Sequence, residues 1–270
     1  MVYDIFGQNV VDYSGASLER ENVYRGGQLL AVIETPTAAA PTNLTAAPSG
    51  NSSTPSITLN WSGGAAYYRV ERSTSKDGPY LPITNISSNT TVDWGVTTGN
   101  AYLYRVCASD VTGNCTSSYT NLALGAAAYF TDDPIVTYAE NPGTETSIKK
   151  VHITELRTAV DAVRTVAGLP GGSWTHTTLT QQVTEVTAAD VNDLRTALDA
   201  ALNDLHLSTS TAYTDVTLAT GASGTVIQKV HFTELRTRAT SNSGTTSSGN
   251  PTTSNVKYVL QDGKARRGRS

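Results

Sequence analysis

The chain has 270 residues, of which 16% are charged, and a formal net charge of −4 at pH 7. This mild charge gives no reason to expect nucleic acid or an anionic membrane as a partner. No run of about 18 apolar residues occurs, so the sequence predicts no membrane-spanning helix. The length allows two domains, and the low charge with abundant Thr, Ser and Gly favours exposed β modules over a compact cytosolic enzyme.

Residues 1–34 alternate short apolar runs with glycine pairs, which predicts closely spaced strands and turns. The stretches YDIFG at 3–7 and YRGG at 24–27 resemble the YD repeats of the RHS family. In that family such hairpins wind into a large β-shell. One repeat is too small to fold alone, so we expect a docking pair of strands here. Residues 35–40 are rich in Thr, Ala and Pro and are predicted to be a linker.

Residues 41–125 carry the clearest strand pattern. Apolar and polar residues alternate at 57–61 (ITLNW), 67–72 (YYRVER) and 102–108 (YLYRVCA), and turn residues separate these runs. Several short strands at this spacing predict a two-sheet β-sandwich.

This segment resembles a fibronectin type III domain. The residues that carry the resemblance are Trp61 in the second strand, Tyr68, Val70 and Arg72 in the third, and Tyr102, Tyr104, Val106 and Ala108 ahead of Gly113. The resemblance implies that Trp61 is a core aromatic between the sheets. It also implies that the Tyr102 hydroxyl bonds back to the chain.

The chain has two cysteines, Cys107 and Cys115. One interpretation is two free thiols that pack as small apolar side chains. The other is a disulfide, which we favour because the pair would face each other across a hairpin of a module with extracellular character.

Residues 128–240 contain one amphipathic pattern nearly three times, with copies that start at Ile148, Val186 and Ile227 and a third copy that is partial. Apolar residues recur at helical spacing. The copies share an acidic-Leu-Arg-Thr core that begins at Glu155, Asp193 and Glu234. Each predicted helix follows an aromatic-Thr pair, which begins at Phe130, Trp174 and Tyr213. A single helix of this length cannot bury its apolar stripe, so we expect units that stack.

These units resemble a repeat found beside type III modules in multidomain bacterial surface and secreted proteins. They have a fainter similarity to S-layer homology units, which also pair an aromatic-Thr-Asp opening with a helix. The openings at 130–132 (FTD) and 213–215 (YTD) fit that pattern, whereas 174–176 (WTH) departs from it. The helix signature of the S-layer family is absent, so cell-wall binding by that route is not expected.

His152 and His231 lie on the apolar stripe, and each precedes a Glu by three residues. A shared metal ion is one interpretation, since His and a carboxylate on adjacent turns can bind one. The alternative is a His bonded to that Glu or to the aromatic-Thr turn. The second copy has Asp190 at this position, and no unit assembles three suitable ligands. We therefore predict no metal and no cofactor.

Two further polar patterns are interpreted as structural. Arg157 and Arg195 are placed on the solvent side, four residues before Asp161 and Asp199, which predicts surface ion pairs. The carboxylates of the pair at 132–133 are predicted to cap a turn rather than to hydrolyse a glycoside. Common catalytic motifs are absent, so we predict that the chain is not an enzyme.

Residues 241–255 consist mainly of Ser, Thr, Gly and Asn and are predicted to be a flexible linker. Residues 256–262 (VKYVLQD) are predicted to form a strand and resemble the opening of another YD repeat. The basic tail at 263–270 is predicted to be a disordered end.

These expectations combine into a multidomain β plus α chain. A β-sandwich is followed by a small, mainly helical repeat domain, and we expect two separately packed bodies with apolar interiors. The predicted function is a non-catalytic scaffold or display segment of an RHS-type bacterial protein at the cell surface or outside the cell. Its expected partners are protein or glycan ligands and the rest of a larger RHS-like chain.

Two alternatives stay open. One is a carbohydrate-binding accessory region of a secreted glycoside hydrolase, which an exposed row of Trp94, Trp174 and Tyr side chains would support. The other is a catalytic domain within the helical units, which an open cleft between His152 and His231 would support.

Overall fold

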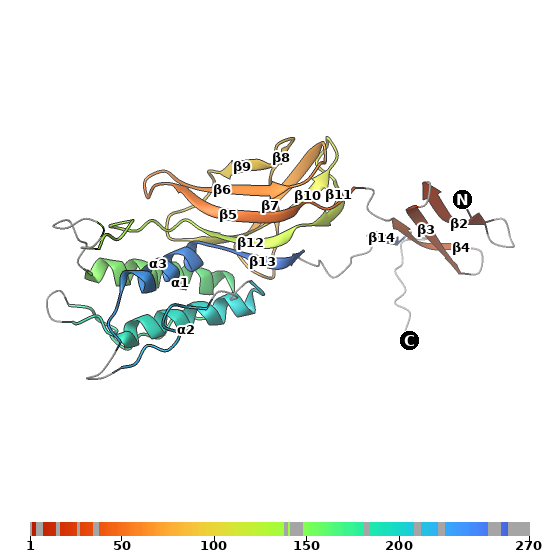
Figure 1. Cartoon of the computed structure of the whole chain (residues 1–270). Helices are drawn as coiled ribbons and strands as arrows, with labels where there is room; N and C mark the ends of the chain where they lie inside the picture. The colour runs from red at the N-terminus through yellow and green to blue at the C-terminus, as the bar shows by residue number, and fades with distance from the viewer. Residues whose placement is uncertain are drawn as a thin grey trace.

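A computed structural model of the chain describes residues 2–3, 8–14, 17–25, 28–34, 38–137, 140, 148–180, 184–207, 212–220, 225–247 and 255–258. It shows a β-sandwich with helices covering one of its sheets (Figure 1). Within the described residues no helix is long and apolar enough to cross a membrane.

The sandwich has a smaller and a larger antiparallel sheet. The smaller sheet has the order β5-β6-β9, with β5 at Thr42–Gly50, β6 at Pro55–Ser62 and β9 at Thr90–Asp93. The larger sheet has the order β13-β12-β10-β7-β8, and β11 also pairs with β10. Its strands are β7 (Tyr67–Ser73), β8 (Leu81–Ile86), β10 (Ala101–Ser109), β11 (Cys115–Tyr119), β12 (Asn121–Ala126) and β13 (Ser241–Ser247). This arrangement confirms the predicted β-sandwich.

The sandwich interior is filled by the side chains that the alternation predicts. Trp61 is 5% exposed, and its ring meets that of Tyr68 edge to face at a centroid distance of 5.5 Å. The hydroxyl of Tyr102 accepts a hydrogen bond from the backbone N–H of Thr97 at 2.9 Å, as the resemblance implied. On β12 a Cβ added to Gly125 would lie 2.9 Å from Ile57, so only glycine lets the two sheets approach this closely here.

The linker predicted at 241–255 is partly wrong, because Ser241–Ser247 form β13 at the edge of the larger sheet. Ser241 lies opposite Gly125, and Ser243 lies opposite Ala123. Composition gives no strand signal in this stretch. The unpaired edge of β12 supplies the missing partner, since backbone groups at an edge can pair with any nearby chain. Residues 248–254 lie outside the described residues.

The described part of the chain has three helices: α1 (Lys150–Val166), α2 (Ala188–Asp204) and α3 (Lys229–Thr240). The third residue of each helix accepts the backbone N–H of the residue before the helix. In α2 this contact is part of a capping box formed by Thr187 and Asp190. The helices therefore begin where their N-terminal N–H groups find acceptors.

The expectation of two separately packed bodies is wrong. Leu103 of β10 and Leu124 of β12 are buried in one cluster with the apolar stripes of the helices. The other face of the same strands packs inside the sandwich. Backbone and charge contacts strengthen this junction, since Lys76 bonds to the Val166 carbonyl at 2.9 Å and to Asp204 at 2.6 Å. Because β10 is apolar on both faces, it serves both interiors.

The two ends of the chain meet in a separate sheet with the order β1-β2-β3-β4-β14. Its strands are β1 (Val2–Tyr3), β2 (Asn9–Ser14), β3 (Ser17–Arg25), β4 (Gln28–Glu34) and β14 (Asn255–Tyr258). Asn255 lies opposite Glu34, so the chain leaves this sheet and re-enters it at neighbouring positions. The predicted linker at 35–37, the end of the predicted strand at 259–262 and the tail at 263–270 lie outside the described residues.

Candidate functional site

The helical part consists of units, each with an aromatic-Thr opening, a turn and a helix: unit 1 at 130–166, unit 2 at 174–204 and unit 3 at 213–240. The acidic residue of each helix binds the opening of its own unit. Glu155 accepts hydrogen bonds from the Thr131 N–H at 2.9 Å and from its hydroxyl at 2.6 Å. Glu234 binds Thr214 in the same way, at 2.8 and 2.7 Å. Asp193 accepts the Thr175 N–H. Each opening is therefore fixed to its own helix.

The arginines of α2 and α3 bind the opening of the next unit, whereas Arg157 of α1 donates to Asp190 of α2 at 3.3 Å. Arg195 donates to the carbonyls of Thr214 and Asp215 at 2.9 and 2.8 Å. Arg236 donates to the carbonyls of Thr131 and Asp132 at 3.0 and 3.1 Å. Since Arg236 belongs to unit 3 and its partners belong to unit 1, the contacts close on themselves.

All three arginines also cover the aromatic side chain in the opening of the next unit. The guanidinium carbons of Arg157, Arg195 and Arg236 lie 5.1, 4.3 and 4.8 Å from the ring centroids of Trp174, Tyr213 and Phe130. Stacking of this kind suits a planar cation that has lost most of its water. We call this closed set of contacts the arginine ring.

The predicted surface position of the arginines is therefore wrong. Arg157 is 8% exposed and Arg195 is 4% exposed, and burial lowers the pKa of Arg195. The carboxylates expected to pair with them bind the next unit instead. Asp161 accepts the N–H of Gly172, just before the unit 2 opening, at 2.7 Å, and Asp199 accepts the Tyr213 hydroxyl at 2.8 Å. The polar side of each helix is covered because the next unit packs on it.

The histidines also bind the openings, as one of the two sequence interpretations states. His152 Nδ1 accepts the Lys149 N–H at 3.1 Å, and its Nε2 lies 3.0 Å from Asp132. A backbone N–H can only donate, so Nδ1 is unprotonated and Nε2–H donates to the carboxylate. His231 makes the same pair of contacts with Gln228 and Asp215. No group of three metal-binding side chains lies among the described residues.

Unit 2 makes the same contact with its two partners exchanged. His176 stands where the other openings have Asp, and Asp190 stands where the other helices have His. The His176 Nδ1 lies 3.0 Å from both carboxylate oxygens of Asp190. The departure of the opening at 174–176 from the common pattern and the loss of His from α2 are thus one exchange.

Asp132 and Asp133 lie in the turn of the first opening. Asp132 has a φ of 51°, and its carboxylate receives Lys149 at 2.7 Å and His152 at 3.0 Å. The Lys149 hydrogen bond, followed by that of His152, lowers the pKa of Asp132. Asp133 lies 3.5 Å from Arg236. Both carboxylates thus lie beside cations.

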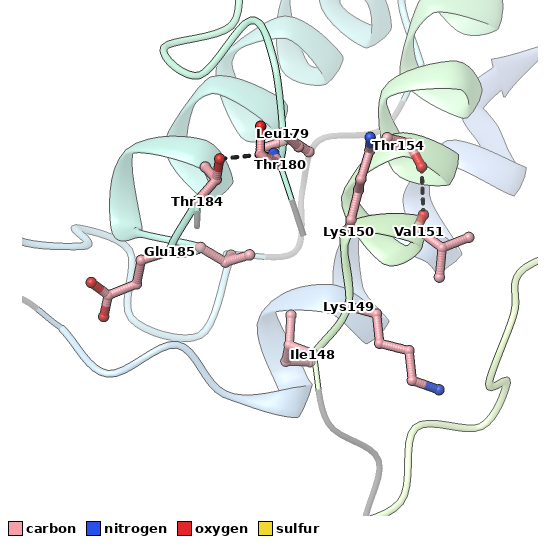
Figure 2. Close-up of a pocket in the computed structure, with 10 residues that line it drawn as sticks. Ile148, Lys149, Lys150, Val151, Thr154, Leu179, Thr180, Thr184 and Glu185 are labelled. Atoms are coloured by element: carbon pink, nitrogen blue, oxygen red, sulfur yellow. Dashed lines mark hydrogen bonds between the residues drawn. The ribbon is translucent and has the colours of Figure 1, made fainter. Parts of the chain in front are cut away.

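A groove of about 790 Å³ lies between the start of α1 and the segment that leads into α2 (Figure 2). Its polar lining comes from Lys149, Lys150, Thr154, Thr180, Thr184 and Glu185. Four apolar side chains complete the walls. Figure 2 shows Lys150 and Thr154 extending from α1 alongside the Leu179–Thr180 stretch, whereas Glu185 points away from α1. The groove offers hydroxyl, ammonium and apolar groups for contact with a ligand.

The exposed aromatic row that would favour carbohydrate binding does not include both tryptophans. Trp94 is 68% exposed on the sandwich. Trp174 is half-buried, because Arg157 covers its ring and Gly172 lies so close that a Cβ there would be 2.5 Å from it. Only Trp94 of this pair can stack on a ligand.

The cysteines are joined, as predicted. Cys107 of β10 and Cys115 of β11 form a disulfide with a Cα–Cα distance of 5.7 Å. The bond ties β11 to the larger sheet beside the register irregularity between Cys107 and Ser109.

No protein-family profile matches the chain. Over 71 residues it is 38% identical to amylopullulanase of Thermoanaerobacter thermohydrosulfuricus, a match that covers 24% of this chain and 5% of that protein. Among solved structures, a Fn3-like protein from Clostridium thermocellum is 37% identical over 32% of this chain and 90% of that chain, with a TM-score of 0.29. The sixth fibronectin type III domain of a human protein is 15% identical, covers 34% of this chain and 88% of that chain, and gives a TM-score of 0.27. The sandwich is thus similar to fibronectin type III-like domains.

Proposed function

We propose that this chain is a non-catalytic accessory region of a secreted bacterial enzyme that acts on polysaccharide. The observation that carries the proposal is the 38% identity over 71 residues to a protein named amylopullulanase. That match spans about one twentieth of the named protein, so the chain would supply binding and spacing rather than the reaction. An α-glucan is the ligand that the name favours.

The architecture supports such a role. The sandwich and the helical units share an apolar cluster, so they hold their binding surfaces in fixed relative positions. Trp94 and Leu81, which are 68% and 61% exposed, are large apolar side chains that the sandwich leaves uncovered. An exposed Trp is suited to the apolar face of a sugar ring, because it combines a large contact area with a rigid geometry.

We further infer that the helical units are copies of one repeat. The acid-to-opening contact recurs in units 1 and 3, the arginines of units 2 and 3 donate to the carbonyls of the next opening, and Arg157 of unit 1 stacks on Trp174. Such a repeat needs its neighbours for burial. Its role in this proposal is a rigid platform beside the sandwich.

Binding to insoluble starch tests the proposal. The purified chain is expected to be retained on starch, and Trp94→Ala is expected to reduce retention severalfold. Val111→Ala, which changes a side chain that is 70% exposed, serves as the matched control. Retention on no polysaccharide would contradict the proposal, as would release of reducing sugar by the purified chain.

A second candidate is the display segment of an RHS-type protein, and one observation favours it. Strand β14 pairs with β4, with Val256 opposite Ile33, so residues 35–254 form an excursion from one sheet. A module inserted into a larger β-shell would have this topology. The introduced pair Ile33→Cys and Val256→Cys is expected to form a disulfide, whereas Ile33→Cys with Tyr258→Cys is not. Equal cross-linking of both pairs would contradict the pairing.

We propose an extracellular location on the basis of the disulfide between Cys107 and Cys115. Disulfides persist in oxidising compartments and are rare in the cytosol. The protein isolated from its natural source is expected to contain no free thiol by mass spectrometry after alkylation. Two alkylated cysteines would contradict this location.

A further inference from the structure

The helical units meet at three junctions within the described residues, and one junction differs from the other two in its contacts. At each, the first turn of a helix faces the turn that precedes the next helix. Glu140, Thr184 and Thr225 hold equivalent places in those turns. The side chain of each accepts the backbone N–H of the residue at the start of its turn, at 2.8 to 2.9 Å. The same pairs are also joined in the other direction. The backbone N–H groups of Glu140, Thr184 and Thr225 donate to the carbonyls of Thr137, Thr180 and Ala219, respectively.

Two of these junctions are bridged by the protein itself. Between units 3 and 1, Lys229 donates to both carboxylate oxygens of Glu140 at 2.6 and 2.8 Å. Between units 2 and 3 the helix has Ala188 in place of the lysine, and Asn192 donates to the Leu218 carbonyl at 3.0 Å. Each bridge joins the start of a helix to the turn opposite it.

Both bridges are missing between units 1 and 2. Lys150 corresponds to Lys229, but Thr184 stands where Glu140 provides the carboxylate. Thr154 replaces Asn192 and donates its hydroxyl to the Val151 carbonyl at 3.0 Å instead. No side chain among the described residues forms an ion pair with Lys150. The groove of about 790 Å³ lies at this junction.

We propose that this groove binds a carboxylated sugar, with the carboxylate on Lys150. Among the described residues this charge has no counterion equivalent to the Glu140 that pairs with Lys229, and a ligand carboxylate would supply one. Lys149, the other groove lysine, is already paired with Asp132 at 2.7 Å. Lys150 is the one cation among the described groove residues without an ion pair, and a single cation suits one carboxylate better than a phosphate dianion or a nucleic acid backbone.

The remaining walls suit a sugar. The Thr184 oxygen accepts the Thr180 N–H at 2.9 Å, which leaves its hydroxyl proton to donate to a ligand. Apolar side chains such as Ile148 and Val151 offer contact to the C–H face of a pyranose ring. The proposal goes beyond the proposed α-glucan role, because it adds a uronic acid as a second class of ligand at a surface other than Trp94.

Calorimetric titration of the whole chain with trigalacturonate and with maltotriose tests the inference. Trigalacturonate is expected to bind, and maltotriose is expected to bind about tenfold more weakly or not at all, since a charge-assisted hydrogen bond is absent. Lys150→Ala is expected to weaken trigalacturonate binding about tenfold. Lys229→Ala is the matched control, because it removes the equivalent lysine from a bridged junction, and it should leave affinity unchanged.

A second variant separates charge from shape. Thr184→Glu places a carboxylate where Glu140 stands in unit 1, so it should pair with Lys150 and abolish trigalacturonate binding while the melting temperature is kept. Equal affinity for both trisaccharides, or unchanged binding by Lys150→Ala, would overturn the inference. Retention on starch through Trp94 is measured separately, so failure of that test and failure of this one are distinguishable.

Discussion

The sandwich and the helical units both bury apolar surface, but they use different kinds of contact to do so. Between the sheets the interior is made of side chains such as Trp61, Tyr68 and Val70, and the closest approach is made at Gly125. Between the units, buried arginines join each helix to the next opening. Alternation gives a sheet one wide apolar face to pack against another sheet, whereas a helix of 12 residues such as α3 has too narrow an apolar stripe to be stable alone. The short helices therefore need polar contacts of defined geometry.

This difference predicts different sensitivities. The sandwich should respond mainly to changes of volume, because its contacts are non-directional. The arginine ring should respond to the loss of single hydrogen-bonding groups, because a buried polar atom left without its partner is costly.

Loss of Arg236 is expected to have the largest effect. Arg236→Ala removes two hydrogen bonds to the unit 1 opening and the stack on Phe130, and it should lower the free energy of unfolding by about 3 kcal/mol. Urea unfolding measures this change. Thr237→Ala alters the exposed neighbour and should change stability by less than about 0.5 kcal/mol. Equal effects of the two variants would contradict a structural role for the buried arginine.

An overpacked sandwich is expected to show the next largest effect. Gly125→Val would place its side chain against Ile57 and Ala46, at 2.9 and 3.1 Å from the new Cβ. We expect a loss of about 2 kcal/mol, since added volume in a close-packed core forces the sheets apart. Chemical denaturation at low and high salt should give the same loss. If the loss of stability caused by Gly125→Val depended on salt as strongly as the loss caused by Arg236→Ala, the proposed contrast between the two regions would be wrong.

Exchange of the reversed pair in unit 2 tests whether the His–Asp contact is interchangeable. His176→Asp alone sets two carboxylates side by side, and Asp190→His alone sets two imidazoles together. Each single variant should lose about 1 to 2 kcal/mol, because a partly buried pair loses its partner. The double variant restores the His–Asp arrangement of units 1 and 3 and should recover part of the loss in a double-mutant cycle, because Arg157 still lacks its contact with Asp190. Additive losses would show that the two residues act independently.

The smallest expected effect is the loss of stability when acid weakens the Lys229–Glu140 bridge between units 3 and 1. The Lys229 hydrogen bond, followed by the Thr137 N–H, lowers the pKa of Glu140 to about 2. A depressed folded-state pKa contributes stability above the unfolded value of about 4.3, and this stability is lost as pH falls toward 2. Thermal unfolding between pH 6 and pH 2 should show a smaller acid-induced drop for Glu140→Gln than for the natural chain. Identical profiles would contradict the assignment.

Sequence patterns predicted the parts of the fold that depend on local periodicity. Alternation located the sandwich, and helical spacing from Ile148 predicted α1, which begins two residues later at Lys150. The resemblance to a type III domain placed Trp61 and Tyr102 in their observed roles. The disulfide followed from the expected hairpin at 107–115.

Contacts between units could not be predicted in the same way. A helical pattern placed Arg157 opposite the apolar stripe, but it does not show that a neighbouring unit covers that side. Strand β13 has no apolar alternation and forms because the edge of β12 is open. One signal was available and was missed: His176 and Asp190 are exchanged relative to Asp132 and His152, as expected for residues in contact.

The closed arginine ring is the central claim, and native-state hydrogen exchange of Arg236→Ala tests it most directly. Arg236 lies in α3, and its partners Thr131 and Asp132 belong to the first opening, more than 100 residues earlier in the chain. The account predicts faster exchange both in α3 and in the first turns of α1, where His152 and Glu155 hold that opening. Faster exchange confined to α3, with α1 unchanged, would contradict it.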